Sequence, residues 1–207
     1  MITVPSHMRH LCRRAVLATL LIMLGASMAW SQGKAPYRNV VVLPRGRITR
    51  IPSPDRQWVL IFECPDAGDP RKLWIENRQS HSRRLVNEYQ RSLAIGWAPN
   101  SKRFFVEDAF ASNESQSYVI EPATLKTIDL SSIITDNDRE AGQYLKAGHS
   151  YLAAKRWLSS HELRVTLFGH FDGNAPPGVL SSFTIRYDVD LSGKARKISK
   201  SSTEEPY

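Results

Sequence analysis

A short turn followed by an apolar strand occurs twice in this chain, and this repeat constrains the fold more than any other feature. Ser53-Pro54-Asp55 precedes the apolar run Trp58–Phe62, and Ala98-Pro99-Asn100 precedes the run Arg103–Val106. The prolines of the two turns are 45 residues apart (54 to 99), and a looser third copy begins at Trp157. A repeat of this length indicates small units that cannot cover their own apolar faces and must pack on their neighbours.

Turn residues divide each repeat into short strands that are rich in β-branched and aromatic residues. The run Trp58–Phe62 is continuously apolar, which indicates a strand covered on both faces, whereas Phe183–Asp190 alternates and indicates one solvated face. About four such strands in each repeat of ~40 to 50 residues are typical of β-propeller blades. The predicted strands are 40–43, 58–62, 72–76, 83–86, 103–106, 117–120, 125–128, 163–168, 183–190 and 195–198.

The segment between the second and third repeats has a different character. Thr135–Gly148 begins with acidic residues and ends with Lys146 and a glycine, which matches the polarity of a helix dipole and a glycine stop. The sequence therefore predicts one short inserted helix. Asp136, Asp138 and Glu140 alternate as the oxygen ligands of a calcium loop would, but the glycine turn and the later bidentate acid of such a loop are missing. The helix is the favoured interpretation.

The repeated turns resemble those of TolB-like β-propellers. In that family a turn of the form W-x-P-D-G-K opens a blade, as Trp97–Lys102 does here and as Ser53-Pro54-Asp55 does in part. A second turn of the form D-x-x-T-G-K is echoed by Glu121–Lys126 and by Asp190–Lys194. The resemblance covers residues 50 to 200 and implies a blade architecture. It also implies a periplasmic surface for binding or assembly, without naming an activity.

The predicted fold is all-β, with stacked antiparallel blade-like sheets in an open or distorted propeller-like arrangement and one short inserted helix. Closed propellers generally need four or more blades, whereas this chain has two clear units and one divergent unit. An open stack, a distorted small propeller and an oligomer that completes a ring all remain open. The inserted helix and the uneven spacing favour an open or distorted single domain.

The first residues have the pattern of a secretory signal peptide. Three arginines precede an apolar run from Ala15 to Ala26, and small residues follow, so we expect cleavage after Ser31 or after Ala29. An uncleaved membrane anchor is the alternative, although the run is shorter than the ~20 residues of a typical span. The predicted domains are the signal peptide 1–31, one β-repeat domain over 32–200 and a frayed tail over 201–207. The predicted location is periplasmic or secreted, without a stable membrane anchor once the signal is cleaved.

Most common reaction motifs are absent from the sequence after residue 31, so no catalytic residue, metal ligand or cofactor is predicted. Cys64 is the only thiol there, which excludes an intramolecular disulfide and favours a small packing residue. His170 and Asp172 lie close together in His170-Phe171-Asp172-Gly173-Asn174 and form the least implausible catalytic pair. Asp-Gly-Asn is also ordinary turn chemistry.

Basic residues gather between positions 45 and 84, and Arg45, Arg47, Arg83 and Arg84 are the candidate binding residues. Together they could hold an anionic polymer or an acidic protein face, whereas interspersed acids favour an ordinary solvated surface. The signal segment holds three arginines and no acid, so its removal lowers the net charge from +8 to +5 and weakens a nucleic-acid role. The predicted partner is an envelope protein or an anionic polymer.

The recurring tryptophans, of which Trp97 is the central one, are interpreted as packing residues rather than carbohydrate-stacking residues. An export signal, a repeat architecture and the lack of a reaction motif together predict an exported, non-catalytic binding or scaffold protein of a bacterial-type envelope. The alternative is an exported hydrolase with a site near His170 and Asp172. Whether the chain is an enzyme is left open, with the sequence favouring a binding role.

Overall fold

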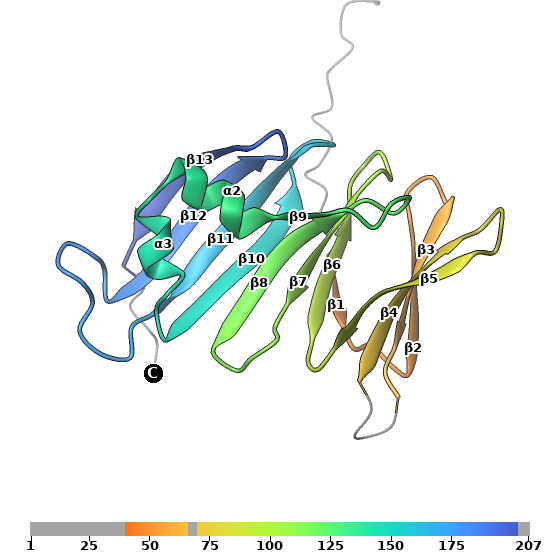
Figure 1. Ribbon diagram of the computed structural model, residues 1–207, viewed down its shortest axis with the longest axis horizontal. Coiled ribbons are helices and arrows are strands. Elements are labelled where there is room, and N and C mark those ends of the chain that lie inside the picture. The colour runs from red at the N-terminus through yellow and green to blue at the C-terminus, as the bar shows by residue number, and fades with distance from the viewer. Residues whose placement is uncertain (1–39, 66–69, 203–207) are drawn as a thin grey trace, which may run out of the picture. The chain divides into compact units, whose positions relative to one another are not determined.

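A computed structural model describes residues 40–65 and 70–202 of the chain. The predicted signal peptide, its cleavage sites and most of the predicted tail lie outside the described residues. The described residues form one short strand, β1, followed by twelve strands in three blade-like units (Figure 1). Unit one is β2 (Ile48–Pro52), β3 (Trp58–Glu63), β4 (Arg71–Asn77) and β5 (Arg83–Tyr89). Unit two is β6 (Leu93–Trp97), β7 (Phe104–Asp108), β8 (Glu114–Ile120) and β9 (Thr127–Asp129). Unit three is β10 (His149–Trp157), β11 (Glu162–His170), β12 (Ser182–Asp190) and β13 (Lys194–Ser201).

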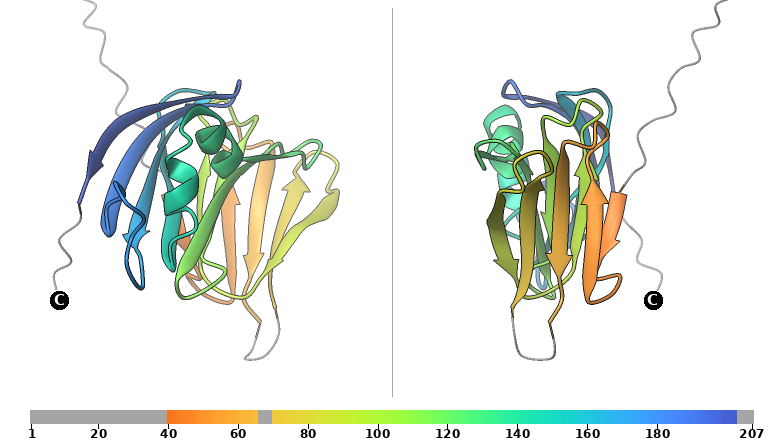
Figure 2. Two further views of the ribbon diagram at one scale, coloured as in Figure 1. Left: turned by 60° about the vertical axis from the view of Figure 1, so that its left-hand side comes forward. Right: turned by 90° about the vertical axis from the view of Figure 1, so that its right-hand side faces the viewer.

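Unit one is a separate four-stranded antiparallel sheet in the order β2-β3-β4-β5. The continuously apolar β3 lies inside this sheet, and its residues Val59–Phe62 are all buried, as the sequence predicts. One face of the sheet packs against unit two, as the right-hand view of Figure 2 shows, in which unit one faces the viewer. The predicted stacking of blade-like sheets is therefore confirmed for the first two units.

Units two and three differ from a stack, because they join side by side in one nine-stranded sheet. The joint is a short parallel pairing in which Ser150 of β10 lies opposite Glu114 of β8, and Tyr151 lies opposite Ser115. β9 has only three residues and pairs with Tyr118–Ile120, so it leaves the first half of the β8 edge unpaired. β10 occupies that half. On the far side of unit two, β1 (Val40–Leu43) pairs antiparallel with β6 and forms the other end of the sheet.

A buried hydroxyl continues the joint where β10 diverges from β8. Ser117 is fully buried, and its Oγ donates a hydrogen bond of 2.6 Å to the carbonyl oxygen of Leu152. The same Oγ accepts a hydrogen bond of 3.1 Å from the backbone N–H of Ala154. The carbonyl group of Leu152 and the N–H group of Ala154 lie where β10 no longer pairs with β8. Ser117 supplies the hydrogen bonds that these buried polar groups require.

Two helices connect units two and three, where the sequence predicts one. α2 (Leu130–Asn137) begins at Asp129, whose carboxylate accepts from the backbone N–H of Ser131, and its residues Leu130, Ile133 and Ile134 are buried. α3 (Ala141–Tyr144) follows after a break at Asp138. The helical segment begins earlier than predicted because Asp129 provides the N-cap, a residue type that favours helix starts. Both helices lie on one face of the nine-stranded sheet (Figures 1 and 2).

Two of the three carboxylates that alternate in this segment, those of Asp138 and Glu140, belong to ion pairs. Asp138 and Glu140 lie 2.6 and 3.1 Å from the ammonium group of Lys197 on β13, and Glu140 also pairs with Lys200. Tyr187 donates a further hydrogen bond of 2.8 Å to Asp138. These contacts hold the helical connection against β12 and β13 of unit three.

The described residues enclose two cores, one on each face of unit two. The first core lies between unit one and unit two and includes Leu60, Phe62, Ile95, Phe104 and Val106. The second core lies under α2 and α3 and combines the opposite face of unit two with one face of unit three. Cys64 is half-buried at the margin of the first core, which agrees with a packing role.

Each core holds one of the predicted packing tryptophans. Trp97 is 6% exposed in the first core, and Trp157 is 1% exposed in the second. The indole N–H of Trp97 donates to the carbonyl oxygen of Ile51 at 3.3 Å, and that of Trp157 donates to the carbonyl oxygen of Gly96 at 2.9 Å. The prediction that Trp97 is a packing residue is confirmed. No helix among the described residues has the length and apolar character needed to cross a bilayer.

Candidate binding site between the repeated turns

The turns that open units one and two have the same local structure. In unit one the Asp55 carboxylate accepts from the backbone N–H of Gln57 at 3.0 Å, and in unit two the Asn100 side chain accepts from Lys102 at 3.1 Å. Side-chain acceptors at this position stabilise tight turns. Arg56 and Ser101 follow them with φ values of 61°, so both turns adopt the left-handed conformation at the place where the family motif has glycine.

These two turns lie next to each other, although 46 residues separate the contacting positions. The backbone N–H of Asp55 donates to Ser101 Oγ at 2.9 Å, which joins the opening turn of unit one to that of unit two. The two opening turns and the loop that follows β8 border a pocket of about 460 Å³. The pocket is lined by Asp55, Gln57, Trp58, Asn100, Ser101, Lys102, Arg103, Glu121, Pro122 and Ala123.

The pocket presents charges of both signs beside an aromatic wall formed by Trp58. Burial acts to raise the pKa of Asp55, but hydrogen bonds from Ser53 and from Gln57 outweigh it and lower that pKa, so Asp55 is a carboxylate. The guanidinium of Arg103 lies 3.3 Å from a carboxylate oxygen of Glu121. Its buried Nε has no hydrogen-bond partner among the described residues, which leaves this cation incompletely satisfied. Such a surface suits a ligand with amide groups and mixed charge.

One of the four predicted binding arginines supports this pocket from outside. Arg84 on β5 donates to the carbonyl oxygens of Pro122 and Ala123 at 2.5 and 3.0 Å, and these two residues line the pocket. Arg84 therefore positions the loop of unit two against unit one. Its guanidinium is used in this contact.

The other three arginines are distributed over different parts of unit one and its connection to β1. Arg83 lies beside Arg84 in sequence but pairs with Glu63 at 2.6 Å and stacks over the Trp74 ring at 4.5 Å. Arg45 and Arg47 are exposed in the connection from β1 to β2, where Arg45 Nε donates to the Val42 carbonyl oxygen at 3.1 Å. Arg83 and Arg84 thus contact different partners within the molecule. The binding role of the four arginines remains a prediction.

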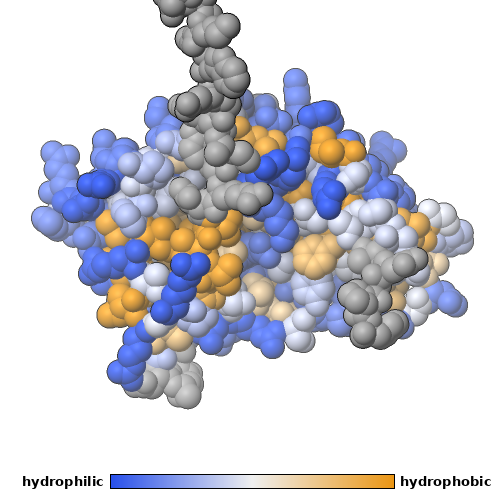
Figure 3. Space-filling view, turned by 180° about the vertical axis from the view of Figure 1, so that it is seen from behind, coloured by the Kyte–Doolittle hydropathy of each residue, from blue (hydrophilic) through white to orange (hydrophobic). Residues whose placement is uncertain are grey.

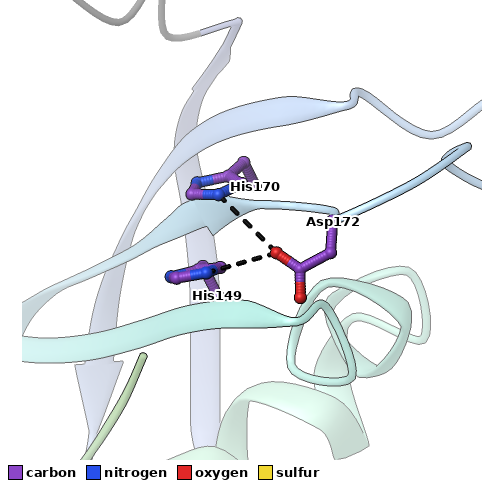
Figure 4. A group of neighbouring side chains, drawn as sticks. All are labelled: His149, His170 and Asp172. Atoms are coloured by element: carbon purple, nitrogen blue, oxygen red, sulfur yellow. Dashed lines mark ion pairs between the residues drawn. The ribbon is translucent and has the colours of Figure 1, made fainter. Parts of the chain in front are cut away.

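The predicted pair His170 and Asp172 is brought together, and a second imidazole joins it. His170 Nε2 lies 3.8 Å from Asp172 Oδ1, and His149 Nε2 lies 3.2 Å from the same oxygen (Figure 4). The third converging group is thus a second imidazole, and the hydroxyl of Tyr151 lies 3.5 Å from the Nδ1 atom of His149. Sequence reasoning missed His149 because its approach depends on the register of β10 against β11.

The pocket residues were also missed, although the sequence carried a usable signal. Ser53–Gln57 and Ala98–Lys102 occupy equivalent places in the repeat, and stacked repeats bring equivalent loops to the same edge. The side chains at these positions are ordinary turn residues, so their types alone do not indicate a site. The signal in the sequence is that the same turn occurs at the same place in both repeats.

No protein-family model matches this sequence, and no curated protein matches it. Solved structures give similarities of form at low sequence identity. The β-propeller domain of the Trilobed protease from Pyrococcus furiosus has a TM-score of 0.47 at 13% identity, over 74% of this chain and 43% of that one. An acylaminoacyl peptidase from Pyrococcus horikoshii has a TM-score of 0.41 at 12% identity, over 75% and 26%. TolB from Acinetobacter baumannii has a TM-score of 0.36 at 10% identity, over 80% and 45%.

The chain thus spans less than half the length of these three structures. The blade-like character of the molecule follows from its own strands and turns, with three four-stranded units in two open sheets. The fold is therefore propeller-like, with blade-like units in open sheets.

Proposed function

We propose that this protein is an exported, non-catalytic binding or scaffold protein of a bacterial-type envelope, and that it holds its partner at the pocket between the repeated turns. The observation that carries this proposal is the meeting of two equivalent turns, joined by the hydrogen bond from Asp55 to Ser101, around a pocket of about 460 Å³. Pockets of this size with a few convergent polar groups are common ligand sites. The export signal in the sequence supports a periplasmic or secreted location.

The charges of the pocket favour a segment of another envelope protein over an anionic polymer. Asp55 and Glu121 would repel a polyanion, whereas Lys102 and Arg103 would be satisfied by the carbonyl and carboxylate groups of a polypeptide. Trp58 offers the apolar surface on which such a segment could pack. The pocket lies between the turns of units one and two and is open to solvent, as suits a macromolecular partner.

Site-specific photo-crosslinking tests this proposal in the cell envelope. A photoreactive residue replaces Ala123, which is exposed and lines the pocket, and in a second variant it replaces Ser201, which is exposed on β13 in unit three. We expect a discrete protein adduct from position 123 and none from position 201. Adding Lys102→Glu should remove the adduct, because Lys102 is an exposed cation of the pocket with its side chain outside both cores.

Three outcomes would contradict the proposal. Equal crosslinking from both positions would indicate non-specific contact, and the absence of an adduct at position 123 would remove the pocket as the binding site. A polysaccharide adduct at position 123 that survives Lys102→Glu would replace the protein partner by a polymer. Thermal unfolding of each variant, compared with the parent, serves as the control for folding.

A further inference from the structure

Two histidines lie directly opposite each other on neighbouring strands of unit three. His149 of β10 is the register partner of His170 of β11, so their side chains leave the same face of the sheet. Their rings stack with centroids 4.2 Å apart and planes 14° from parallel. Each side chain is about one-third exposed, at 34% for both residues. The pair is therefore fixed by the sheet and remains accessible to solvent.

Asp172 completes this pair from the segment that follows β11. Its Oδ1 lies 3.2 Å from His149 Nε2 and 3.8 Å from His170 Nε2, as Figure 4 shows. One ligand atom from each residue lies within 4.8 Å of the other two. Two ligands at tetrahedral positions around Zn²⁺ are separated by about 3.3 Å, given metal–ligand distances of about 2.0 Å. The three side chains are thus close to the spacing that a shared ion needs.

Two glycines allow this convergence. A Cβ atom on Gly148 would lie 1.9 Å from Asp172 Oδ2, so a side chain there would displace the carboxylate. A Cβ atom on Gly169, whose φ is 152°, would lie 1.9 Å from the carbonyl oxygen of His149. The carbonyl oxygen of Gly148 also accepts a hydrogen bond of 2.7 Å from Asn113, which anchors the backbone beneath the site.

Tyr151 orients the first imidazole. Its hydroxyl donates to the carbonyl oxygen of Ser112 at 2.9 Å, so the phenolic oxygen offers a lone pair to His149 Nδ1, which lies 3.5 Å away. In the tautomer that carries the proton on Nδ1, the Nε2 lone pair is directed at the Asp172 carboxylate. Two acceptors facing each other are stabilised by a cation between them, and an outer partner that sets the tautomer is typical of metal-ligating histidines.

We propose that His149, His170 and Asp172 bind a divalent transition-metal ion, with Zn²⁺ as the representative. The ligands are Nε2 of each imidazole and the Asp172 carboxylate, and water fills the remaining positions because Asp172 is 62% exposed. Imidazole nitrogen selects Zn²⁺ and related ions over Mg²⁺ and Ca²⁺, which prefer oxygen ligands. The site belongs to unit three and is independent of the pocket proposed as the binding site.

Isothermal titration of Zn²⁺ into tag-free protein that begins at residue 32 tests the proposal. We expect one equivalent of Zn²⁺ to bind, with an affinity that falls at least about tenfold in His149→Ala, His170→Ala and Asp172→Asn. Ca²⁺ should show no binding at the same concentrations. At a Zn²⁺ concentration of a hundred times the Kd, the midpoint of thermal unfolding should rise by about 5 to 10 °C.

His161→Ala is the matched control variant. His161 Nε2 lies 3.9 Å from Asp190 Oδ2, which provides a histidine–carboxylate pair without the second imidazole. This variant should bind Zn²⁺ like the parent. A loss of affinity equal to that of His149→Ala would overturn the proposal, as would a parent that binds no Zn²⁺ or variants that bind it unchanged.

Gly148→Ala separates a shaped site from a chance group of ligands. All three ligands remain, but the added methyl group occupies the position of Asp172 Oδ2 and must turn that carboxylate away. We expect a lower Zn²⁺ affinity together with a metal-free unfolding midpoint close to that of the parent. Asp172→Asn offers the same test with an exposed side chain, so failure of a histidine variant to fold does not prevent a decision. Unchanged affinity in Gly148→Ala and in Asp172→Asn would exclude the carboxylate as a ligand.

Discussion

The two junctions between units use the same hydrogen bond but produce different assemblies. At the junction of units one and two, Trp97 donates to the carbonyl oxygen of Ile51, and at the junction of units two and three, Trp157 donates to that of Gly96. Ile51 and Gly96 occupy equivalent places in the repeat, each two residues before the first residue of the opening turn. The first junction stacks two sheets face to face, whereas the second continues one sheet sideways.

The length of the last strand of each unit accounts for this difference. β5 has seven residues and pairs along β4, so the edge of β4 is not available to β6. β9 has three residues and leaves Glu114 and Ser115 of β8 available to β10. The repeated tryptophan thus sets the contact between neighbouring units. The length of the last strand of a unit determines whether the next unit stacks on its sheet or extends it.

Removing the tryptophan of each junction should have the largest effect. Trp97→Ala and Trp157→Ala should each lower the free energy of unfolding by about 3 to 5 kcal/mol, because both truncate a buried aromatic side chain. Trp157→Ala should cost more, since Trp157 is the more buried and makes the shorter hydrogen bond. Chemical denaturation measures both. Parent-like stability of Trp97→Ala with loss of a bound partner would make Trp97 a recognition residue instead.

Ser117→Ala should weaken only the sideways junction. The backbone groups of Leu152 and Ala154 would lose their partner, at a cost of about 2 to 4 kcal/mol, because unsatisfied buried polar groups keep their desolvation penalty. Hydrogen exchange should accelerate at Ala154 while unit one keeps its protection. Uniform acceleration across unit one and unit three would show that the two junctions unfold together.

The stacked junction should respond to pH through Asp108. This residue lies near Tyr89 of unit one and Tyr118 of unit two, and burial raises its pKa to about 6. The folded protein therefore binds a proton that the unfolded chain releases near pH 4, so stability falls as pH rises from about 4 to 6. Asp108→Asn should raise the free energy of unfolding by about 1 to 2 kcal/mol at pH 7 and flatten this dependence. An unchanged pH profile of unfolding would contradict the assignment.

The helical connection of the second junction should respond in the opposite direction, with the smallest effect. Burial acts to raise the pKa of Asp138, but the Lys197 ammonium and the Tyr187 hydroxyl outweigh it and lower that pKa. Lys200 lowers the pKa of Glu140. Their contribution is present above the ordinary carboxylate range and is lost as pH falls through the lowered values. Lys197→Met should cost up to about 1 kcal/mol at pH 7 and less at pH 3, as measured by urea unfolding.

The sequence predicted most of the strands, the repeated turns and the packing tryptophans, because these follow from local residue patterns. It missed the first strand of each unit, namely β2, β6 and β10. It did not predict the joining of units two and three, since that depends on β9 ending at Asp129 and on Ser117 receiving two distant backbone groups. The arginines were grouped by their closeness in sequence, but strand alternation directs Arg83 and Arg84 to different partners. His170 and Asp172 were singled out, whereas His149 required a register that no local pattern reveals.

Figure 3 shows the back of the molecule, where hydrophobic side chains reach the surface at the end that carries unit one and β1. Val42 of β1 and Ile48 of β2 are exposed hydrophobic residues. At the β13 end of the nine-stranded sheet charged side chains are more frequent, since β13 carries Lys194, Arg196 and Lys197. Lysine and arginine on an edge strand oppose pairing with another chain.

The helices on the nine-stranded sheet act as an end cap. In an array of repeats, growth continues as long as the last unit presents an apolar face to its successor, and a terminal element with a polar outer side stops it. α2 and α3 bury Leu130, Ile134 and Tyr144 in the face that a further unit would need. A fourth unit fused after β13 would therefore find that face already filled. A longer array that used this face would require the segment between β9 and β10 to be redesigned first.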